Sequence, residues 1–433
     1  MMDVQEIMKK WDVPGVAIGI VRDGKVIYSQ GFGYKDVNNL SPVTSRTVMP
    51  IGSATKSFTA VVLCYLENKG ILSLDEPIKT YIPDLKLYNS LLTENVTLRD
   101  CLCHRTGLSR HDIHGMYCIK DRKSMVSNLE YLEPKYPFRS RLQYSNQMVM
   151  LAGYVAQVCT GKSWEGLVQE IILDPLEMKH TYLDIQSMKK DSDYSIGYND
   201  GCQESGYLTL EGLAPAGSIN SCVEDMNKYL LFQLSDGMGI LPKKYLNQMH
   251  KVQIFGSPYS WKMEELSECN YGLCWFVDVY RNHKMIDHGG NTLGFSALMT
   301  LLPEQNVGII VLSNRTSTYV VNDVTYRIID QILGLKELDW TQKMKGCLKQ
   351  KKETISYVPI SNCEYNGIYV HPAFGKIHIE NGKGNLNGFE FQFEKDCIHM
   401  KMFETNIPIQ FNDDGIVVCI EDGLKPIIFY KES

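Results

Sequence analysis

The stretch VAIGIVRDGKVIYSQGFG, residues 16–33, carries the clearest signal for the fold. Two β-rich runs flank the tetrapeptide RDGK at 22–25, and an Asp-Gly pair between such runs is a strong hairpin signal. Far along the chain, ALMTLLPEQNVGIIVLSN at 297–314 repeats the arrangement around a turn at 303–306. The chain therefore has a predicted hairpin near each end of its larger part.

The residues between the two hairpins read as mostly helical, as in SATKSFTAVVLCYLENKG (53–70) and NQMVMLAGYVAQVCTGKSWEGLVQEIIL (146–173). Strands at both ends with helices between them predict an α/β fold. We expect an antiparallel sheet built from both chain ends and flanked by helices, with an inserted helical region.

The C-terminal part has a different pattern. VNDVTYRIIDQILGLKELDW (321–340) reads as a closing helix, and the lysine-rich TQKMKGCLKQKKETISYV (341–358) as a solvated helical linker. Short alternating runs with Asn-Gly and Gly-Lys-Gly turns follow and predict a small antiparallel β-barrel. The expected domains are 1–335, a linker at 336–360, and 361–433.

The bulk composition excludes several classes of protein. The 433 residues are 44% hydrophobic and carry a net charge of −6 that is not gathered in blocks, which argues against a nucleic-acid or anionic-membrane surface. The longest apolar run near the N-terminus, 58–66, is too short to span a bilayer. The opening residues do not resemble a secretion signal, so we expect a cytoplasmic protein.

The 13 cysteines are an odd number in a long chain and predict reduced thiols rather than a disulfide framework. Cys101, Cys103 and His104 lie close together in the sequence, but their spacing matches no standard zinc pattern. We expect no metal and no cofactor.

Ser53 and Lys56 are spaced to do chemistry together. A serine hydroxyl needs a neighbouring base, and residues i and i+3 of a helix share one face. A buried lysine loses its proton readily, and a helix start stabilises a developing oxyanion. Ser-x-x-Lys recurs at Ser187 and Lys190, but in a polar stretch, whereas small residues and an apolar helix surround Ser53.

Two further segments offer partners for this pair. In LQYSNQMVM, Tyr144 and Asn146 precede an apolar helix, and a tyrosine beside an ammonium group can act as a base and an acid. In MIDHGGNTLGF, His288 is followed by Gly289, Gly290 and Asn291, where glycines permit a close backbone approach to a ligand. Taken alone, each segment is more often structural: a core tyrosine with a helix-capping asparagine in the first, and a hydrogen-bonded structural histidine in the second.

In this order the motifs resemble the serine β-lactamase and penicillin-binding-protein superfamily, and the Tyr-x-Asn motif is similar to its class C β-lactamase, esterase and D-aminopeptidase branch. TLRDCLCHRTGL (97–108), APAGSINSCVEDMNKYL (214–230) and YGLCWFV (271–277) look like that branch as well. The C-terminal part is similar to the small lipocalin-like domain of some members.

The resemblance implies a residue-by-residue assignment. Ser53 would be the acylated nucleophile, Lys56 its proton partner and Tyr144 the general base and acid. Asn146 would orient lysine and substrate, and the backbone N–H groups of Ser53 and Asn291 would form the oxyanion hole. His288 and Gly290 would complete the substrate-binding strand.

The resemblance also sets the expected activity. We expect a serine hydrolase acting through an acyl-serine on a small-molecule or peptide substrate, either an amide or peptide, D-residues included, or an ester. True class C enzymes have lysine where this chain has His288, which lowers the expectation of penicillin hydrolysis. Acyl transfer to a non-water nucleophile, peptide cyclisation and a slow penicillin-binding sensor stay open, as does a homo-oligomer.

Overall fold

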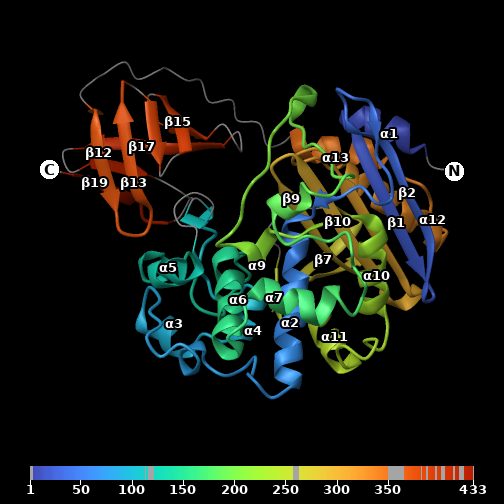
Figure 1. Cartoon of the computed structure of the whole chain (residues 1–433), viewed down its shortest axis with the longest axis horizontal. Coiled ribbons are helices and arrows are strands. Elements are labelled where there is room, and N and C mark those ends of the chain that lie inside the picture. Colours follow the sequence, from blue (N-terminus) through green and yellow to red (C-terminus); the bar gives the residue numbers. More distant parts are fainter. Residues whose placement is uncertain are drawn as a thin grey trace.

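The computed structural model describes residues 3–112, 114–115, 121–256, 263–349, 365–381, 383–386, 389–394, 397–400, 405–412, 415–418 and 424–432. Within these residues, nine antiparallel strands form the main sheet (Figure 1). Their order across the sheet is β3 (Ser41–Pro42), β2 (Lys25–Asp36), β1 (Gly15–Arg22), β11 (Val307–Ser313), β10 (Phe295–Leu302), β9 (His283–Thr292), β8 (Phe276–Tyr280), β7 (Leu266–Tyr271) and β6 (Ile254–Phe255).

The two predicted hairpins meet at the centre of this sheet. Strand β1 pairs with β11 from Val16 opposite Ser313 to Arg22 opposite Val307. Asp23 and Gly24 connect β1 to β2 with φ angles of 48° and 75°, the positive values that a tight hairpin turn requires. The prediction of an antiparallel sheet built from both chain ends is confirmed.

The sheet lies between two layers of helices because its side chains alternate between its faces. Val16 and Ile18 pack on one face with helices α1 (Val4–Trp11), α12 (Val320–Leu333) and α13 (Trp340–Lys349). Ala17 packs on the opposite face with α2 (Thr55–Asn68) and α10 (Val223–Leu234). We call the first the rear face and the second the front face (Figure 1).

The inserted helical region follows the first three strands and packs against α2 on the front side of the sheet (Figure 1). Its longest helix is α6 (Asn146–Thr160). Besides α2 and α10, the other described elements between β3 and β6 are β4 (Met49–Pro50), η1 (Gly52–Ala54), η2 (Ile78–Thr80), α3 (Ser90–Asn95), α4 (Leu98–Leu102), α5 (Arg122–Ser127), η4 (Asn128–Tyr131), α7 (Trp164–Val168), η5 (Gln169–Leu173), α8 (Ile185–Met188), η6 (Asp200–Cys202), α9 (Ala214–Gly217), β5 (Asn220–Ser221) and α11 (Lys243–Met249). A further short turn, η7 (Pro303–Gln305), lies between β10 and β11.

The closing helix is shorter than the sequence suggests. Helix α12 ends at Leu333, and Gly334 follows with a φ of 64°, the usual glycine stop signal. Trp340 begins α13 and is fully buried, and its indole nitrogen donates to Asp330 at 2.9 Å. The first turn of the expected solvated linker is therefore packed onto α12, while residues 350–360 of that linker lie outside the described residues.

The C-terminal strands form an antiparallel barrel, closed where β12 pairs with β19 through Tyr369 opposite Lys431 (Figure 1). The described strands are β12 (Gly367–His371), β13 (Gly375–Glu380), β14 (Lys383–Leu386), β15 (Phe389–Glu394), β16 (Cys397–Met400), β17 (Thr405–Asn412), β18 (Gly415–Val418) and β19 (Ile427–Lys431). The predicted small barrel is confirmed, whereas the lipocalin resemblance and the domain boundaries stay predictions. Among the described residues, no helix is long and apolar enough to cross a membrane.

Candidate active site

Ser53 lies in the 3-10 turn η1, directly before helix α2. The chain reaches this turn through β4, and the Ile51 N–H donates to the Ile219 carbonyl at 2.9 Å. Gly52 has a φ of +52°, a left-handed conformation that favours glycine. The hydroxyl of Ser53 is thereby held at the N-terminal end of α2, where backbone N–H groups and the helix dipole favour negative charge.

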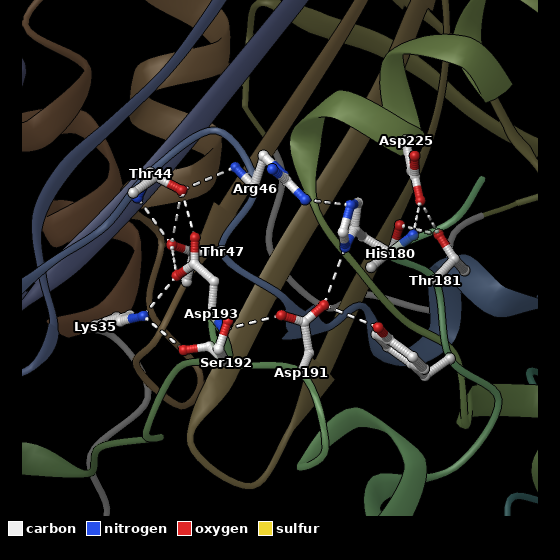
Figure 2. A network of polar contacts seen from close by, with 12 residues as sticks. Lys35, Thr44, Arg46, Thr47, His180, Thr181, Asp191, Ser192, Asp193 and Asp225 are labelled. Atoms are coloured by element: carbon white, nitrogen blue, oxygen red, sulfur yellow. Dashed lines mark hydrogen bonds and ion pairs between the residues drawn. The ribbon is translucent and has the colours of Figure 1, made fainter. Parts of the chain in front are cut away.

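A polar network anchors the segment that leads to Ser53 (Figure 2). Asp193 accepts hydrogen bonds from Lys35 at 2.7 Å, Thr44 at 2.6 Å and Thr47 at 2.8 Å. The backbone of Val48 adds a bond of 2.7 Å from its N–H to the Asp193 carbonyl. Burial alone would raise the pKa of Asp193, but these hydrogen bonds outweigh it and hold the pKa below its usual value.

The same network continues around His180 (Figure 2). The ring of His180 contacts Asp191 at 3.0 Å, and its backbone N–H donates to Asp225 at 2.7 Å. Asp225 also accepts from Thr181 at 3.0 Å. Hydrogen bonds thus connect the loop that carries Asp191 and Asp193 both to α10, through His180, and to residues 44–48, which lead into β4 and Ser53.

Lys56 is fully buried one turn after Ser53 and makes three hydrogen bonds. Its Nζ lies 3.1 Å from Ser53 Oγ, 2.7 Å from Asn146 Oδ1 and 2.7 Å from the Ala216 carbonyl oxygen. Burial lowers the pKa of Lys56 to about 7, and the positive charge of Arg110 acts in the same direction. A substantial fraction of the lysine is therefore neutral near pH 7.

These contacts suit a neutral amine. The Asn146 oxygen and the Ala216 carbonyl can only accept, so they take the two protons of an uncharged NH₂ group. The lone pair then faces Ser53 Oγ, from which it can accept a proton. Lys56 can act as a base without breaking either of its other hydrogen bonds.

Asn146 begins helix α6, and Asp112 fixes its orientation. Its side-chain nitrogen donates to Asp112 Oδ1 at 2.9 Å. A carboxylate only accepts, so the amide oxygen must face Lys56. Sequence reasoning missed Asp112, because nothing in its local pattern shows that it meets a residue 34 positions away.

Tyr144 is buried against the lysine. Its ring centroid lies 4.9 Å from Lys56 Nζ and 5.0 Å from Arg110 Cζ. The ring of His104 packs against it at 4.2 Å, and His288 lies 6.2 Å away between centroids. The structure therefore places the Tyr144 ring against Lys56, the lysine next to Ser53.

Strand β9 runs directly past Ser53. A Cβ atom placed on Gly290 would lie 1.8 Å from the Ile51 carbonyl oxygen and 2.9 Å from Ser53 N. A Cβ atom on Gly52 would lie 2.9 Å from Asn291 N. Only glycines permit this approach, and Ser53 and Asn291 both line the same small cleft.

His288 is turned inward. Its Nδ1 contacts the Gly289 carbonyl oxygen at 2.7 Å and its Nε2 contacts the Tyr271 hydroxyl at 2.9 Å. Because a carbonyl only accepts, Nδ1 carries the proton and Nε2 accepts from Tyr271. Burial, followed by the positive charge of Lys56, lowers the pKa of His288 to about 3, so the ring is neutral. It supplies no positive charge to a substrate.

A small cleft of about 60 Å³ opens in front of Ser53. Arg110 lies at this cleft and forms an ion pair of 2.7 Å with Asp112. Sequence reasoning missed Arg110, although it lies only two residues after the quoted TLRDCLCHRTGL motif, which ends at Leu108. The cleft is lined by Gly52, Ser53, Arg110, Asn146, Leu208, Leu210, Leu213, Ala216, Gly217, Asn291 and Thr292.

The other sequence candidates lie elsewhere. Ser187 is in the short helix α8, where its hydroxyl donates to Asp184 at 2.7 Å, and Lys190 is exposed. Cys101 and Cys103 are buried core residues. In the part of the chain that the structure describes, no three His, Cys, Asp or Glu side chains form a group that could hold a metal ion.

Known proteins are similar to this chain in sequence and in fold. The family model described as Beta-lactamase matches residues 3–333. The "Unguisins hydrolase ungD'" of Aspergillus campestris is 27% identical over 416 residues, which cover 87% of this chain and 76% of that protein. "Protein flp" of Staphylococcus aureus strain MW2 is 27% identical over 369 residues, which cover 82% of this chain and 70% of that protein.

Two solved structures share the architecture. The octameric penicillin-binding protein homologue from Pyrococcus abyssi aligns with a TM-score of 0.71 and 24% identity over 97% of each chain. The class C beta lactamase from Rhodobacter sphaeroides aligns with a TM-score of 0.61 and 21% identity over 76% of this chain and 97% of that one. At this identity the two structures establish the fold, and the family model, which matches residues 3–333, establishes that the chain belongs to the beta-lactamase family.

Proposed function

We propose that the protein is a serine hydrolase that cleaves small amides, peptides or esters through an acyl-serine intermediate. The observation that carries this proposal is the environment of Lys56. Its nitrogen meets Ser53 Oγ at 3.1 Å while two acceptors, Asn146 Oδ1 and the Ala216 carbonyl, hold it in place. The name of the "Unguisins hydrolase ungD'" relative supports hydrolysis as the reaction class.

The proposed reaction begins with Ser53. Its Oγ attacks the substrate carbonyl carbon as its proton passes to the Lys56 amine, forming a tetrahedral intermediate. The negative oxygen of that intermediate is stabilised by the N–H groups of Ser53 and Asn291. Collapse breaks the bond to the leaving amine or alcohol, which takes a proton from Lys56 directly or through Tyr144. Water then releases the acyl group by the reverse sequence.

Arg110 supports a preference within this class. Its guanidinium lies at the cleft near Tyr144, and the neutral His288 offers no charge of its own. A substrate carboxylate on that side of the cleft would meet the guanidinium. We therefore favour peptides or amides with a free carboxylate over neutral esters.

The test combines labelling with turnover. Wild type, Ser53→Ala and Ser187→Ala are incubated with a fluorophosphonate probe and followed by intact mass spectrometry. Ser187→Ala is the matched control, because Ser187 heads the second Ser-x-x-Lys sequence but is only half-buried, and its lysine, Lys190, is exposed. One adduct on wild type and on Ser187→Ala, but none on Ser53→Ala, is expected.

Substrate panels then decide the fate of the acyl group. Wild type is given p-nitrophenyl esters and L- and D-amino-acid amides, with and without added amines. Free acid as the product supports hydrolysis; a dominant amide product would instead support acyl transfer, and a persistent acyl mass would support a sensor. Labelling of Ser53→Ala at the wild-type rate would overturn the proposal.

Oligomeric state is a separate proposal. The Pyrococcus abyssi neighbour is described as octameric, and this supports testing the present chain for a homo-oligomer. Light scattering of the full chain would give its mass relative to the 49.3 kDa of one chain. A single-chain mass at every concentration would reject this proposal.

A further inference from the structure

A second cavity lies at the rear face of the sheet. Its volume is about 640 Å³, much larger than the cleft in front of Ser53. Helix α12 and the residues just before it form one wall, and strands β7 to β10 form another. The lining includes Met263, Cys269, Asp278, Asp287, Tyr319 and Tyr326.

Two carboxylates reach this cavity from adjacent strands. Asp278 on β8 lies opposite Met285 on β9. Met285 packs on the rear face, and Asp287 follows it by two residues on the same strand. Strand partners and residues two apart point to the same face, so both carboxylates face rearward. Asp278 is 6% exposed and Asp287 is 9% exposed.

Asp287 has no compensating partner in the part of the chain that the structure describes. No described side chain or backbone group there donates a hydrogen bond to it or forms an ion pair with it, and burial is what raises its pKa, to about 7. The Asp287 charge also contributes, after burial, to raising the pKa of Tyr326, so the tyrosine lies near it. A buried carboxylate without a donor is costly unless a cation or a proton accompanies it.

The rest of the lining is suited to an apolar body. Met263, Leu298 and Val321 line the cavity, together with the rings of Tyr319 and Tyr326. Aromatic rings attract ammonium groups through their faces. A volume of about 640 Å³ falls in the range of sites for small organic ligands.

We propose that this rear cavity binds an organic cation, a protonated amine attached to an apolar or aromatic body, with its ammonium group on Asp287. A metal ion fits the lining less well. Calcium and magnesium require six or more oxygen ligands, whereas much of this wall is hydrocarbon. An organic amine needs only one or two carboxylates for its ammonium group, and its apolar body can pack against the hydrocarbon part of the wall.

The rear site is distinct from the catalytic cleft. Asp287 lies on the same strand as His288 and Gly290 but points to the opposite face, because side chains alternate along β9. Asn291 lines both cavities. Ligand binding at the rear therefore does not require Ser53 or Lys56.

The experiment uses tryptamine as the probe and the full chain at pH 8, where Asp287 is ionised and the amine is protonated. Calorimetry measures binding to wild type, to Asp287→Asn and to Asp236→Asn. Asp236 is the control, because its side chain is 85% exposed and lies on the surface beside Lys243. The neutral analogue indole-3-ethanol tests the charge of the ligand, and protein whose Ser53 is blocked by fluorophosphonate excludes binding in the cleft.

We expect one tryptamine to bind per chain, with the same affinity whether or not Ser53 is blocked. The affinity of Asp287→Asn for tryptamine should be at least about tenfold lower than that of Asp236→Asn. Indole-3-ethanol should bind at least about tenfold more weakly than tryptamine. A second variant, Gly289→Val, tests the volume, since a Cβ there meets only the Ala297 carbonyl at 3.6 Å and Leu298 Cδ1 at 3.8 Å. This variant should weaken tryptamine binding while keeping the wild-type melting temperature.

Several results would overturn the proposal. Failure of wild type to bind tryptamine would refute it and would favour two carboxylates that share a proton. Equal binding by wild type and Asp287→Asn, or loss of binding when Ser53 is blocked, would equally refute it. None of these results bears on the acyl-serine proposal, which is tested by labelling of Ser53 and by turnover of the substrate panels.

Discussion

The side-chain nitrogen of Asn146 donates to Asp112 at 2.9 Å, and this bond turns the Asn146 oxygen toward Lys56 at 2.7 Å. Asp112 touches none of the reacting atoms. We propose that it is a positioning residue, because a carboxylate can accept only and thereby selects one of the two orientations of the amide. The lysine that faces Ser53 is held through this chain of contacts.

Replacing Asp112 tests that role. We expect Asp112→Ala to lower kcat/KM about a hundredfold, the scale of a misplaced catalytic group. The negative charge of Asp112 raises the pKa of Lys56. In a plot of kcat/KM against pH, the rise on the acid side (the acid limb) should therefore move to lower pH when that charge is removed. Asp236→Ala is the exposed control. A lower melting temperature with an unmoved acid limb would assign Asp112 a purely structural role.

The pH dependence of acylation tests Lys56 itself. The pKa of Lys56 is lowered to about 7 by burial, and only the neutral amine can take the proton of Ser53. The rate of fluorophosphonate labelling should therefore rise with pH up to about 7 and level off above it. Lys56→Arg should lose at least about a hundredfold, because guanidinium keeps its proton. A flat profile between pH 5.5 and 8.5 would contradict the assignment.

Gly290 is expected to tolerate no side chain. A Cβ atom there would lie 1.8 Å from the Ile51 carbonyl oxygen, so Gly290→Ala must displace strand β9 from the nucleophile turn. We expect acyl transfer to fall at least about a hundredfold. Gly346→Ala is the matched control, since a Cβ at that helical position meets nothing within 4 Å. Unchanged labelling in Gly290→Ala would show that Asn291 contributes nothing to oxyanion stabilisation.

His288→Lys tests the position at which the chain departs from class C enzymes. His288 is 1% exposed and bound to Tyr271, so a lysine there would be desolvated. A buried lysine has a lower pKa in the folded than in the unfolded chain. The unfolded chain then binds more protons, and the loss in melting temperature should grow as the pH falls from 9 to 6.

The same variant should also change substrate preference. We expect kcat/KM for a carboxylate-bearing ester, relative to its neutral analogue, to rise about two- to fivefold, the value of one weak charge pair. His283→Lys, at the far end of the same strand, is the control. An unchanged ratio in His288→Lys would show that this position does not contact the substrate.

Asp193 is predicted to contribute stability that depends on pH. Its hydrogen bonds from Lys35, Thr44 and Thr47 hold its pKa below the usual value. The ionised form therefore stabilises the fold above the unfolded-state pKa, and this stability is lost as pH falls through the lower folded-state pKa. Asp193→Asn should lower the melting temperature by about 2–5 °C at pH 7 and by less at pH 3. The control, Asp236→Asn, should change the melting temperature little at either pH. If Asp193→Asn lowered the melting temperature by the same amount at pH 7 and at pH 3, the assignment would be refuted.

Much of the fold could be predicted because it depends on local patterns. Two β-rich runs around an Asp-Gly turn identify the hairpin at 16–33, and the matching hairpin at 297–314 supplies its partner strand. The short barrel strands were visible in the same way. The start of α13 was missed, because Trp340 forms its hydrogen bond to Asp330 only after the chain has turned back at Gly334.

The sequence by itself determined the two hairpins, at 16–33 and 297–314, and the spacing that puts Lys56 one turn from Ser53, since both depend on neighbours a few residues apart. The tertiary structure decided what that lysine can do. Its two other partners, Asn146 and Ala216, are 90 and 160 positions away, and its burial comes from helices that only folding brings together. Desolvation and hydrogen-bond geometry set a pKa, and both depend on distances in space that the order of residues does not contain.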